Sequence, residues 1–474
     1  MPETSLNKKN RLIVNPKEGW RSVARKVIKL ALPIILSNLL YTVESAFSII
    51  LVSGLSSTAV AAVGYSASML WFIYSLMALS YTGTSVLVAQ MTGARKDPSP
   101  ALLWGLLISF LIALPLTFVG TDLVTFLMGK FGASERVVNL ARDYLDPIFA
   151  FITVGFITNT VYAAYNGYGD TKTPFQVALL MNVVNISSAY LLIYGNLGFP
   201  RMEVRGAGWG IALSELVGFL AYVLLYITKK KPFPITWNLD KRVLLNILRI
   251  GTPTAFERAF SSLSFNIFVG FLASFGDKVL AAHQIGLRVE SASFMIGFGF
   301  MVASTTLSGQ NWGAKNYSGL DYGIKTTAHI TALLMGFMGV LLALFPRYFS
   351  LIFTRDVQVI EYAVYYLVIV AFSQPQMAYA SIYSGALKGM GKTYIPLLVN
   401  SLSFWVFRII PSYFLLKYFH TPLVPWVFMS VEMTTRAIIF YIAYRREMSK
   451  LLNCETEEEK CKKADIEGVK RQTL

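Results

Sequence analysis

Three acidic side chains lie in stretches of sequence that are otherwise mostly apolar, and they are the first candidates for chemistry. Glu44 lies in NLLYTVESAFSII, Glu257 in PTAFERAF and Glu290 in GLRVESASF. A charged group in apolar surroundings is strongly unfavourable unless it is paired or has a function. A carboxylate in such a place can bind a proton or a small cation and later release it, so we expect these acids to bind or move a cation.

Two amide side chains supply a second kind of ligand. Asn182 and Asn185 in MNVVNISSAY are three residues apart, so they share one face of a helix. Their carbonyl oxygens can serve a cation or a hydrogen-bonded proton network, and hydrogen bonding between helices explains them equally well. The weaker candidates are Gln284, Arg288 and Arg408, together with the acids Glu215 and Glu432, either of which can face a contact between helices.

Arg288 gives the main alternative explanation for two of the acids. It can pair with Glu290, or with Glu257 from the neighbouring helix, and either acid would then be a neutralised part of the core. Because pairs of this kind are common in membrane proteins, both explanations stay open for Glu257 and Glu290.

The segments that carry these residues are long apolar runs. Of the 474 residues, 55% are hydrophobic and 14% are charged, against about 25% charged in an average soluble protein. A helix of about 20 apolar residues spans a bilayer, and these runs are too long and too uniform for barrel strands. We therefore predict an all-α membrane protein with twelve transmembrane helices, at 27–53, 60–90, 101–128, 141–166, 173–196, 207–228, 243–275, 279–309, 322–346, 358–387, 393–418 and 422–445.

Basic residues identify the cytoplasmic side. The formal net charge is +16, and lysine and arginine gather before the first span and in alternate connections, at 95–96, 229–242, 315 and 388–392. This is the asymmetry of the positive-inside rule. It predicts a multi-pass protein of the cytoplasmic membrane with both termini in the cytoplasm, and it assigns the basic charge to membrane lipid and not to nucleic acid.

The sequence repeats itself across its two halves. Ala-Leu-Pro at 31–33 matches Gly-Thr-Pro at 251–253, and LVAQMTGARK at 87–96 matches LSGQNWGAKN at 307–316, both at one and the same offset. GYGDTKTP at 167–174 matches GMGKTYIP at 389–396 at nearly that offset. Six spans separate each pair, so the halves share one membrane orientation and form a parallel repeat. The predicted domains are a cytoplasmic segment 1–26, an N-lobe 27–228, a linker 229–242, a C-lobe 243–445 and a cytoplasmic tail 446–474.

Signs of enzymatic chemistry or bound cofactors are missing from the sequence. GALKGMGKT at 385–393 resembles a phosphate-binding loop, but its glycine spacing is wrong by one residue and no strand precedes it. The three histidines, His283, His329 and His420, are far apart in sequence, and no metal signature or nucleophile motif accompanies them. We expect no enzyme activity, no cofactor and no resident metal site, so any transport would have to use an ion gradient.

The ordered landmarks resemble those of the multidrug and toxic compound extrusion (MATE) family of the MOP superfamily. They are Ala-Leu-Pro in the first span, Ala-Ala-Val-Gly opening the second, Gln-x-x-Gly-Ala-Arg closing it, and Gly-x-Gly-Asp-Thr-Lys-Thr-Pro before the fifth. The second half adds LAAHQIGLRVES, SGQNWGAKN and GALKGMGKTYIP, followed by Arg408 and Pro411. The resemblance covers roughly residues 27–445.

This resemblance implies two six-helix lobes, related by pseudo-twofold symmetry, around a central cavity. It implies export of bulky, often cationic organic compounds by alternating access, in exchange for protons or sodium ions, by a monomer. Many relatives carry one aspartate in the first span, at the position of Ser48, and another in the fifth span, at the position of Ala189. Glu44 precedes Ser48 by one helical turn, so it is positioned to supply the missing charge and to form, with Asn185, a sodium or proton site.

Each half has an acid on its first helix. In the aligned frame Glu257 corresponds to Ser37, seven residues before Glu44, so the two acids point to similar faces of equivalent helices. If those faces line a cavity, the two acids flank it. Each acid can then bind a proton from one side of the membrane and release it to the other side. A cationic substrate would compete with the proton for the same carboxylates. That competition is the chemistry of an antiporter.

Three other functions are alternatives to an exporter. A flippase for lipids or lipid-linked oligosaccharides in the same superfamily would show a strongly charged cavity and sometimes extra spans. A membrane-embedded enzyme would need a catalytic motif, and a channel would not need the parallel two-lobe repeat that suits alternating access. The sequence favours a cation-coupled exporter of small organic substrates.

Overall fold

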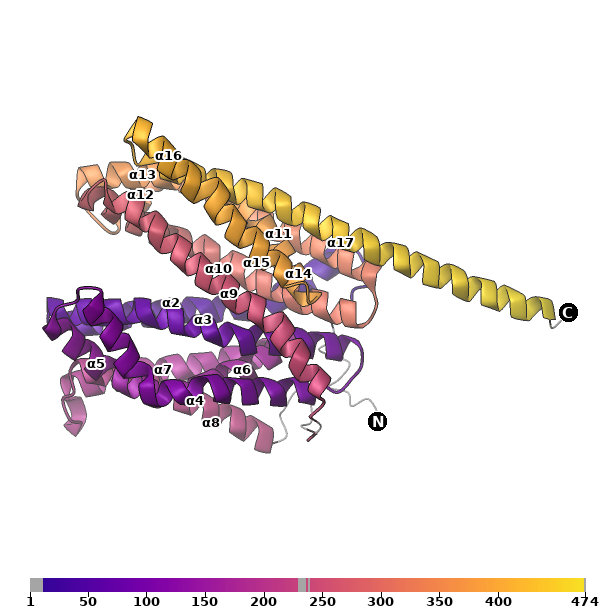
Figure 1. Cartoon of the computed structure of the whole chain (residues 1–474), viewed down its shortest axis with the longest axis horizontal. Coiled ribbons are helices and arrows are strands. Elements are labelled where there is room, and N and C mark those ends of the chain that lie inside the picture. Colours follow the sequence, from indigo (N-terminus) through magenta and orange to yellow (C-terminus); the bar gives the residue numbers. More distant parts are fainter. Residues whose placement is uncertain (1–11, 229–235, 238, 473–474) are drawn as a thin grey trace. The chain divides into compact units, whose positions relative to one another are not determined.

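The structure, a computed structural model, describes the backbone of residues 12–228, 236–237 and 239–472 and the side chains up to Asn453. Every regular element in these residues is a helix, which confirms the prediction of an all-α protein (Figure 1). The elements are α2 (Trp20–Ser53), α3 (Ser57–Gly93), α4 (Ser99–Lys130), α5 (Glu135–Ala150), α6 (Ile152–Tyr168), α7 (Lys172–Tyr194), η1 (Asn196–Gly198), α8 (Val204–Ile227), α9 (Lys241–Ala273), α10 (Asp277–Gly313), α11 (Tyr317–Leu344), α12 (Pro346–Leu351), α13 (Val357–Ala371), α14 (Gln374–Gly389), α15 (Tyr394–Ser403), η2 (Phe404–Ile409), α16 (Ile410–Phe419) and α17 (Leu423–Gln472).

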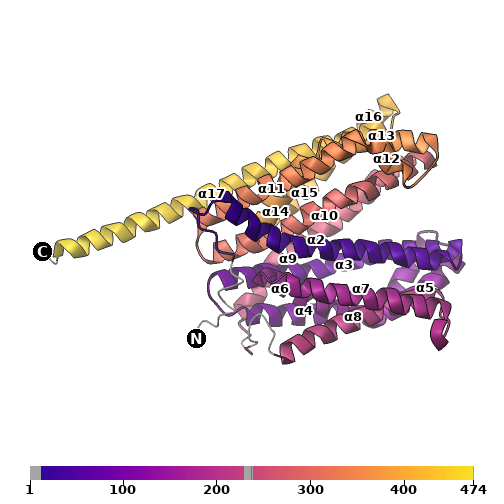
Figure 2. The same cartoon turned by 180° about the vertical axis from the view of Figure 1, so that it is seen from behind.

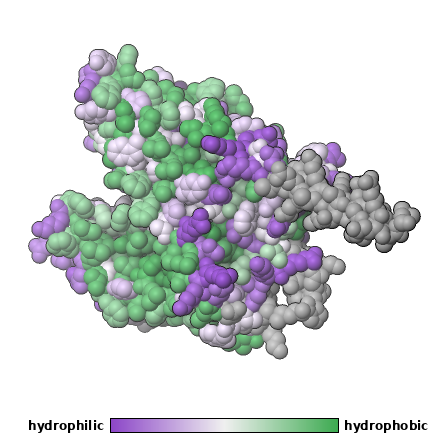
Figure 3. Space-filling model, turned by 45° about the vertical axis from the view of Figure 1, so that its right-hand side comes forward, coloured by the Kyte–Doolittle hydropathy of each residue, from purple (hydrophilic) through white to green (hydrophobic). Residues whose placement is uncertain are grey.

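The long helices are apolar enough to cross a membrane. In the described part of the chain, nine spans pass on length and composition, and eleven if each of two bent helix pairs counts as one span. The remaining predicted span corresponds to α9, which is 33 residues long but carries Glu257 and Arg258 near its middle. Figure 3 shows broad areas of hydrophobic side chains on the face in view, as expected for helices that meet lipid.

Two predicted spans are broken in the middle, which the sequence did not predict. The helices α5 and α6 meet at an angle of 54°, and α13 and α14 meet at 53°. The first break falls at Phe151 and the second beside Phe372, and the repeat makes these places equivalent in the two halves. Proline explains the second break, because Pro375 opens α14 and cannot donate a backbone hydrogen bond to the end of α13. Pro147 lies inside the last turn of α5, before the first break.

The repeat is also visible in the backbone of the turns. Arg95 and Lys315, which occupy equivalent positions of the repeat, both have left-handed backbones, with φ of 58° and 56°. The following amides close equivalent turns, since Lys96 N donates to Met91 O at 2.8 Å and Asn316 N donates to Asn311 O at 2.9 Å. These are the six-residue bonds of a Schellman motif. The repeated motif therefore terminates α3 and α10.

The second repeated motif ends a helix in the same way. Gly169 and Gly391, which are equivalent in the two copies of this motif, have φ of 96° and 79°. Asp170 N donates to Tyr165 O at 3.0 Å, and Lys392 N donates to Leu387 O at 2.9 Å. Glycine is favoured at both places because a left-handed backbone strains any residue that has a Cβ.

The chain divides into two compact units. Within the described residues, unit 1 contains Lys29–Thr92 and Lys96–Leu263, and unit 2 contains Leu12–Ile28, Gly93–Arg95 and the chain from Ser264 onward. The helices α7 and α8 of unit 1 lie side by side along their length, in both directions of view (Figure 2). In unit 2, α10 packs against α14, and α14 packs against α11 and α17.

The unit boundary does not coincide with the predicted lobe boundary. The predicted C-lobe began at 243, whereas the first part of α9 groups with unit 1 as far as Leu263. Most of the predicted linker 229–242 and the start of the predicted cytoplasmic segment, residues 1–11, lie outside the described residues. Helix α17 continues beyond the predicted twelfth span into the predicted tail (Figure 1).

A short extended segment of unit 2, residues 12–14, is held by side-chain amides of the repeated motif in the second half. Leu12 N donates to Gln310 Oε1 at 2.7 Å, and Val14 N donates to Asn311 Oδ1 at 3.0 Å. Asn311 Nδ2 returns a bond to Leu12 O at 2.8 Å, and Asn316 Nδ2 donates to Val14 O at 2.7 Å. We call residues 12–14 the N-terminal strap. The backbone N–H and C=O groups of Leu12 and Val14 are thus all paired with side-chain amides.

Candidate functional site

The helices α2 and α7 bring the first candidate acid against the candidate amides. Asn185 Nδ2 on α7 donates a hydrogen bond to Glu44 Oε1 on α2. Further along both helices, Tyr194 Oη donates to Leu51 O at 2.7 Å. Since both contacts advance in the same direction along the chain, α2 and α7 run parallel, and residues one turn apart on each helix stay level with each other.

Asn182 completes this group from one turn earlier on α7. It is 7% exposed, and its side chain also interacts with the Glu44 carboxylate. Asn182 Nδ2 donates to Ala178 O at 3.3 Å, whereas Asn182 Oδ1 is buried without a hydrogen-bond partner among the described residues. A buried amide oxygen with no donor is unfavourable unless something else satisfies it. This oxygen is therefore available to a cation or to a protonated carboxyl group.

A second acid belongs to the same site. Glu215 on α8 interacts electrostatically with Glu44, and Tyr41 interacts with both acids. Glu215 packs against Gly155 of α6, where an added Cβ would lie 3.3 Å from the Glu215 carboxyl carbon. Glu215 Oε2 is buried and has no hydrogen-bond partner in the described part of the chain. The sequence ranked this acid low because it does not show which face of α8 meets α2.

Ala189 and Ser48, the positions at which the family resemblance implies aspartate in many relatives, carry no charge here. Ala189 is buried, and its Cβ lies 2.8 Å from the place that a Cβ on Gly210 would occupy, so this position forms a close contact between α7 and α8. Ser48 is only partly buried and makes no hydrogen bond through its side chain within the described residues. The charge of this site comes from Glu44 and Glu215.

The two acids share a site that lacks a neutralising base in the described part of the chain. Among the residues that the structure describes, no lysine or arginine forms an ion pair with Glu44 or Glu215. Their carboxylates are instead surrounded by amides and by the tyrosines Tyr41, Tyr74 and Tyr144. We call Glu44, Asn182, Asn185 and Glu215 the carboxylate–amide cluster. Two acids that face each other without a base can share a proton or together hold a small cation.

Unit 2 contains a separate buried polar network. Glu290 on α10 accepts hydrogen bonds from Tyr366 Oη at 2.6 Å and from Gln374 Nε2 at 3.1 Å. Ser293 Oγ donates to Gln374 Oε1 at 2.6 Å. The alternative pairing of Glu290 with Arg288 is not formed, because Glu290 points into the helix packing while Arg288 is exposed. Side chains that are two positions apart lie on different faces of a helix.

Arg408 belongs to the same buried region. Arg408 Nη2 donates to Glu432 Oε2 at 2.5 Å, and their side chains are only 4% and 0% exposed. The guanidinium lies 4.4 Å from the centroid of the Phe404 ring and 5.3 Å from that of Phe268. Arg408 is part of η2, a π-helical segment, and such segments often occur at functional sites. Of these two acids, Glu432 is paired with a base, whereas Glu290 accepts hydrogen bonds from neutral side chains, as Glu44 does.

The remaining candidates differ in their burial. Glu257 is buried on α9 in unit 1, and its part in coupling stays a prediction. Gln284 and Arg288 are exposed on α10. Within the described residues, no group of three or more histidine, cysteine, aspartate or glutamate side chains has the geometry to hold a metal ion.

Comparisons with known proteins agree on one family. The MatE family profile matches residues 33–191 and 253–414. The chain is 31% identical to the "Probable multidrug resistance protein NorM" of Thermotoga maritima, over 94% of this chain and 97% of that protein. It is 24% identical to the "Probable multidrug resistance protein YoeA" of Bacillus subtilis, over 86% and 90% of the two chains.

Solved structures share the fold. A crystal structure of MATE in the straight conformation aligns with a TM-score of 0.86 at 21% identity, over 95% of this chain and 100% of that chain. An outward-facing multidrug resistance MATE transporter of the MOP superfamily aligns with a TM-score of 0.86 at 21% identity, over 96% and 100%. These likenesses confirm the predicted fold class, an all-α membrane protein with twelve helices in two lobes.

Proposed function

The chain belongs to the MATE family of membrane transporters, and on this premise we propose that it exports organic, often cationic compounds in exchange for a cation. The exported compounds are small organic molecules, as the names of the multidrug resistance relatives suggest. The protein would act as a monomer in the cytoplasmic membrane, with both termini in the cytoplasm and without a cofactor. The coupling ion is a proton or a sodium ion.

The observation that supports this proposal best is the carboxylate–amide cluster. Glu44 and Glu215 interact with each other, and no base pairs with either acid among the described residues. An incoming cation removes the repulsion between the two acids, whether it is a proton shared between them or a sodium ion that both bind. The amide oxygen of Asn182 is a further ligand for either ion.

The cluster also gives a route from ion binding to conformational change. Glu44 lies on α2, Asn182 and Asn185 on α7, and Glu215 on α8, so one bound cation contacts three helices of unit 1. A cation can shift a conformational equilibrium only as far as its affinity differs between the two states. A site divided among three helices meets this condition, since small movements of one helix change the ligand set.

The test is transport in proteoliposomes that contain the purified full-length protein. A fluorescent cationic dye is supplied, and a pH gradient and a sodium gradient are imposed separately. Dye movement that follows only the pH gradient supports proton coupling, and movement that follows only the sodium gradient supports sodium coupling. No movement under either gradient contradicts the exporter proposal. Movement of a fluorescent lipid between leaflets under the same conditions would favour the flippase alternative.

A further inference from the structure

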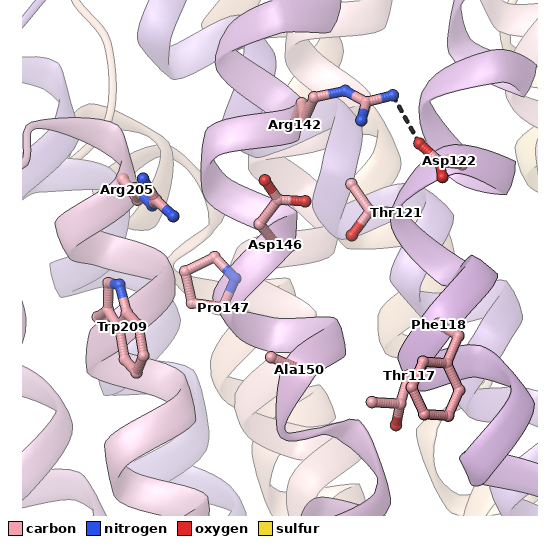
Figure 4. Close-up of a pocket in the computed structure, with 10 residues that line it drawn as sticks. All are labelled: Thr117, Phe118, Thr121, Asp122, Arg142, Asp146, Pro147, Ala150, Arg205 and Trp209. Carbon is pink, nitrogen blue, oxygen red and sulfur yellow. Dashed lines mark hydrogen bonds and ion pairs between the residues drawn. The ribbon is translucent and has the colours of Figure 1, made fainter.

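A pocket of about 380 Å³ lies in unit 1, and none of the residues of the carboxylate–amide cluster lines it. Its walls come from α4, α5 and α8, and its polar lining consists of Thr117, Thr121, Asp122, Arg142, Asp146 and Arg205 (Figure 4). Phe118 and Trp209 provide aromatic walls. The transport mechanism proposed above does not use any of these residues.

The charges of the pocket leave one acid and one base free. Arg142 Nη2 pairs with Asp122 Oδ1 at 2.7 Å. The Asp146 carboxylate and the Arg205 guanidinium, by contrast, have no ion-pair or hydrogen-bond partner among the described residues. Figure 4 shows the Asp146 carboxylate between Arg205 on one side and the Asp122–Arg142 pair on the other. A ligand that complements this arrangement carries one cationic group and one anionic group.

An apolar surface on α4 runs from the middle of the helix to this pocket. Leu107, Phe110, Leu111, Leu114 and Phe118 recur at intervals of three, four and seven residues, so they share one helix face. All five are exposed, from Leu114 at 36% to Phe118 at 76% at the pocket itself. On a helix that crosses a membrane, such a face is covered by acyl chains. The surface therefore connects the path of a lipid tail with a charged pocket.

The pocket lies toward the helix ends, as a headgroup site must. Arg205 lies in the first turn of α8, so the pocket is level with the start of that helix. Trp209 packs edge-on against Phe151 with 5.9 Å between ring centroids, so one wall is fixed by packing. Tryptophan and arginine are residues that suit the interface between acyl chains and water.

From this geometry we infer that the pocket binds the headgroup of a zwitterionic phospholipid with a primary ammonium, such as phosphatidylethanolamine. The phosphate accepts hydrogen bonds from Arg205, and the ammonium donates to Asp146, with the Thr121 hydroxyl beside it. Phosphatidylglycerol lacks the cation for Asp146. The trimethylammonium group of phosphatidylcholine cannot donate hydrogen bonds to the carboxylate. The lipid is a bound partner on the outside of unit 1 and not the exported substrate.

Native mass spectrometry of the detergent-solubilised full-length protein tests this inference. Phosphatidylethanolamine, phosphatidylglycerol and phosphatidylcholine with identical acyl chains are titrated separately. We expect phosphatidylethanolamine to bind about tenfold more tightly than the other two, since loss of one charged hydrogen bond typically has that effect. Asp146→Asn should remove this preference. Arg205→Gln should instead weaken the binding of all three lipids by a similar factor, because each of them carries the phosphate.

Two charge-matched variants serve as controls. Asp143→Asn and Arg136→Gln change exposed residues of α5 that do not line the pocket, so both should keep the preference. If Asp146→Asn keeps the preference as well, or if Arg205→Gln leaves the affinity for all three lipids unchanged, the inference is overturned. Free phosphoethanolamine that binds as tightly as the lipid would also overturn it, because the tail would then contribute nothing.

A photocrosslinker gives a positional test that does not depend on these charges. With p-benzoylphenylalanine at position 118, at the mouth of the pocket, irradiation in vesicles of phosphatidylethanolamine and phosphatidylglycerol should attach mainly phosphatidylethanolamine. The same group at position 126, an exposed phenylalanine two turns further along α4, should attach both lipids in proportion to their abundance. Equal labelling patterns at the two positions would contradict a headgroup-selective site.

Discussion

Asn185 on α7 donates a hydrogen bond to the carboxylate of Glu44 on α2. One turn further along these two helices lie Ser48 and Ala189, which carry no charge. The resemblance to the MATE family implies aspartates at these two positions and an asparagine at position 185. Because α2 and α7 run parallel, Glu44 is level with this asparagine, one turn before the position of Ser48.

The first prediction concerns Glu44. Glu44→Gln should abolish gradient-driven dye transport in proteoliposomes, because glutamine cannot gain or lose a proton and holds a cation only weakly. In the Glu44→Gln background, Ser48→Asp should restore part of the transport, since it returns a carboxylate to the same helix face one turn away. The matched control is Glu203→Gln, which removes an exposed acid and should leave transport unchanged. Normal transport by Glu44→Gln would show that this acid is structural.

The second prediction concerns the partnership of Glu44 and Glu215. Glu215→Gln should reduce the initial rate of transport several-fold, because the shared cation loses one of its two acids. An unchanged initial rate in Glu215→Gln would mean that Glu44 binds the coupling cation without this second acid. Initial rates under the same imposed gradient provide the measurement.

The third prediction concerns the buried ion pair of unit 2. Arg408→Met should destabilise the protein by about 3 kcal/mol, because it leaves the Glu432 carboxylate buried with only Arg436 as a partner. The double variant Arg408→Met/Glu432→Gln should recover much of this loss. Arg445→Met, which removes an arginine that is about half exposed, should have little effect. Denaturation monitored by tryptophan fluorescence in detergent compares the four proteins.

The fourth prediction tests the backbone of the repeated turns. Gly391→Ala should destabilise the protein by about 1 kcal/mol, since alanine is strained at a φ of 79°. Gly129→Ala is the matched control, because Gly129 lies in the last turn of α4 with nothing within 4 Å of an added Cβ. That change should be neutral or slightly stabilising. Equal effects of the two variants would argue against strain as the cause.

The fifth prediction is a pH dependence at the start of α13. Asp356 caps this helix by accepting hydrogen bonds from Val359 N and Gln358 N, and with Lys278 nearby these interactions lower its pKa. A carboxylate with a lowered pKa stabilises the folded state above its unfolded pKa of about 3.9, and this contribution is lost as the pH falls through the folded value. Asp356→Ala should therefore speed amide hydrogen exchange in the first turn of α13 at pH 7. The difference in exchange rate between this variant and the unmodified protein should shrink below about pH 3. A difference that is the same at both pH values would exclude the ionised cap as its origin.

The sequence predicted the repeated parts of the fold well. The pairs Arg95 with Lys315 and Gly169 with Gly391 lie at the offsets found by alignment, and each pair has the same backbone conformation. Helix limits also followed the apolar runs, because a membrane sets their length. The two bends near Phe151 and Phe372 were missed, although a proline lies close to each break. Proline is common enough in membrane helices that its presence alone does not locate a bend.

The candidate site was predictable only in part. Spacing alone placed Asn182 and Asn185 on one face, and the structure puts both beside Glu44. Glu215 was ranked low, and a pairing of Glu290 with Arg288 that the structure does not form was left open, for the same physical reason. Which side chains meet depends on how each helix is rotated about its axis, and periodicity leaves that rotation open when a helix is apolar all round.

The N-terminal strap has a consequence for the timing of biosynthesis. Leu12 and its acceptor Gln310 are 298 residues apart in sequence. At about 5–20 residues per second, the ribosome makes residue 310 some 15–60 s after residue 12. Throughout that interval the amides of residues 12 and 14 have no access to the side chains that later hold them. The hydrogen bonds of the N-terminal strap therefore form late. They can form only after the chain has been synthesised and inserted at least as far as the end of α10.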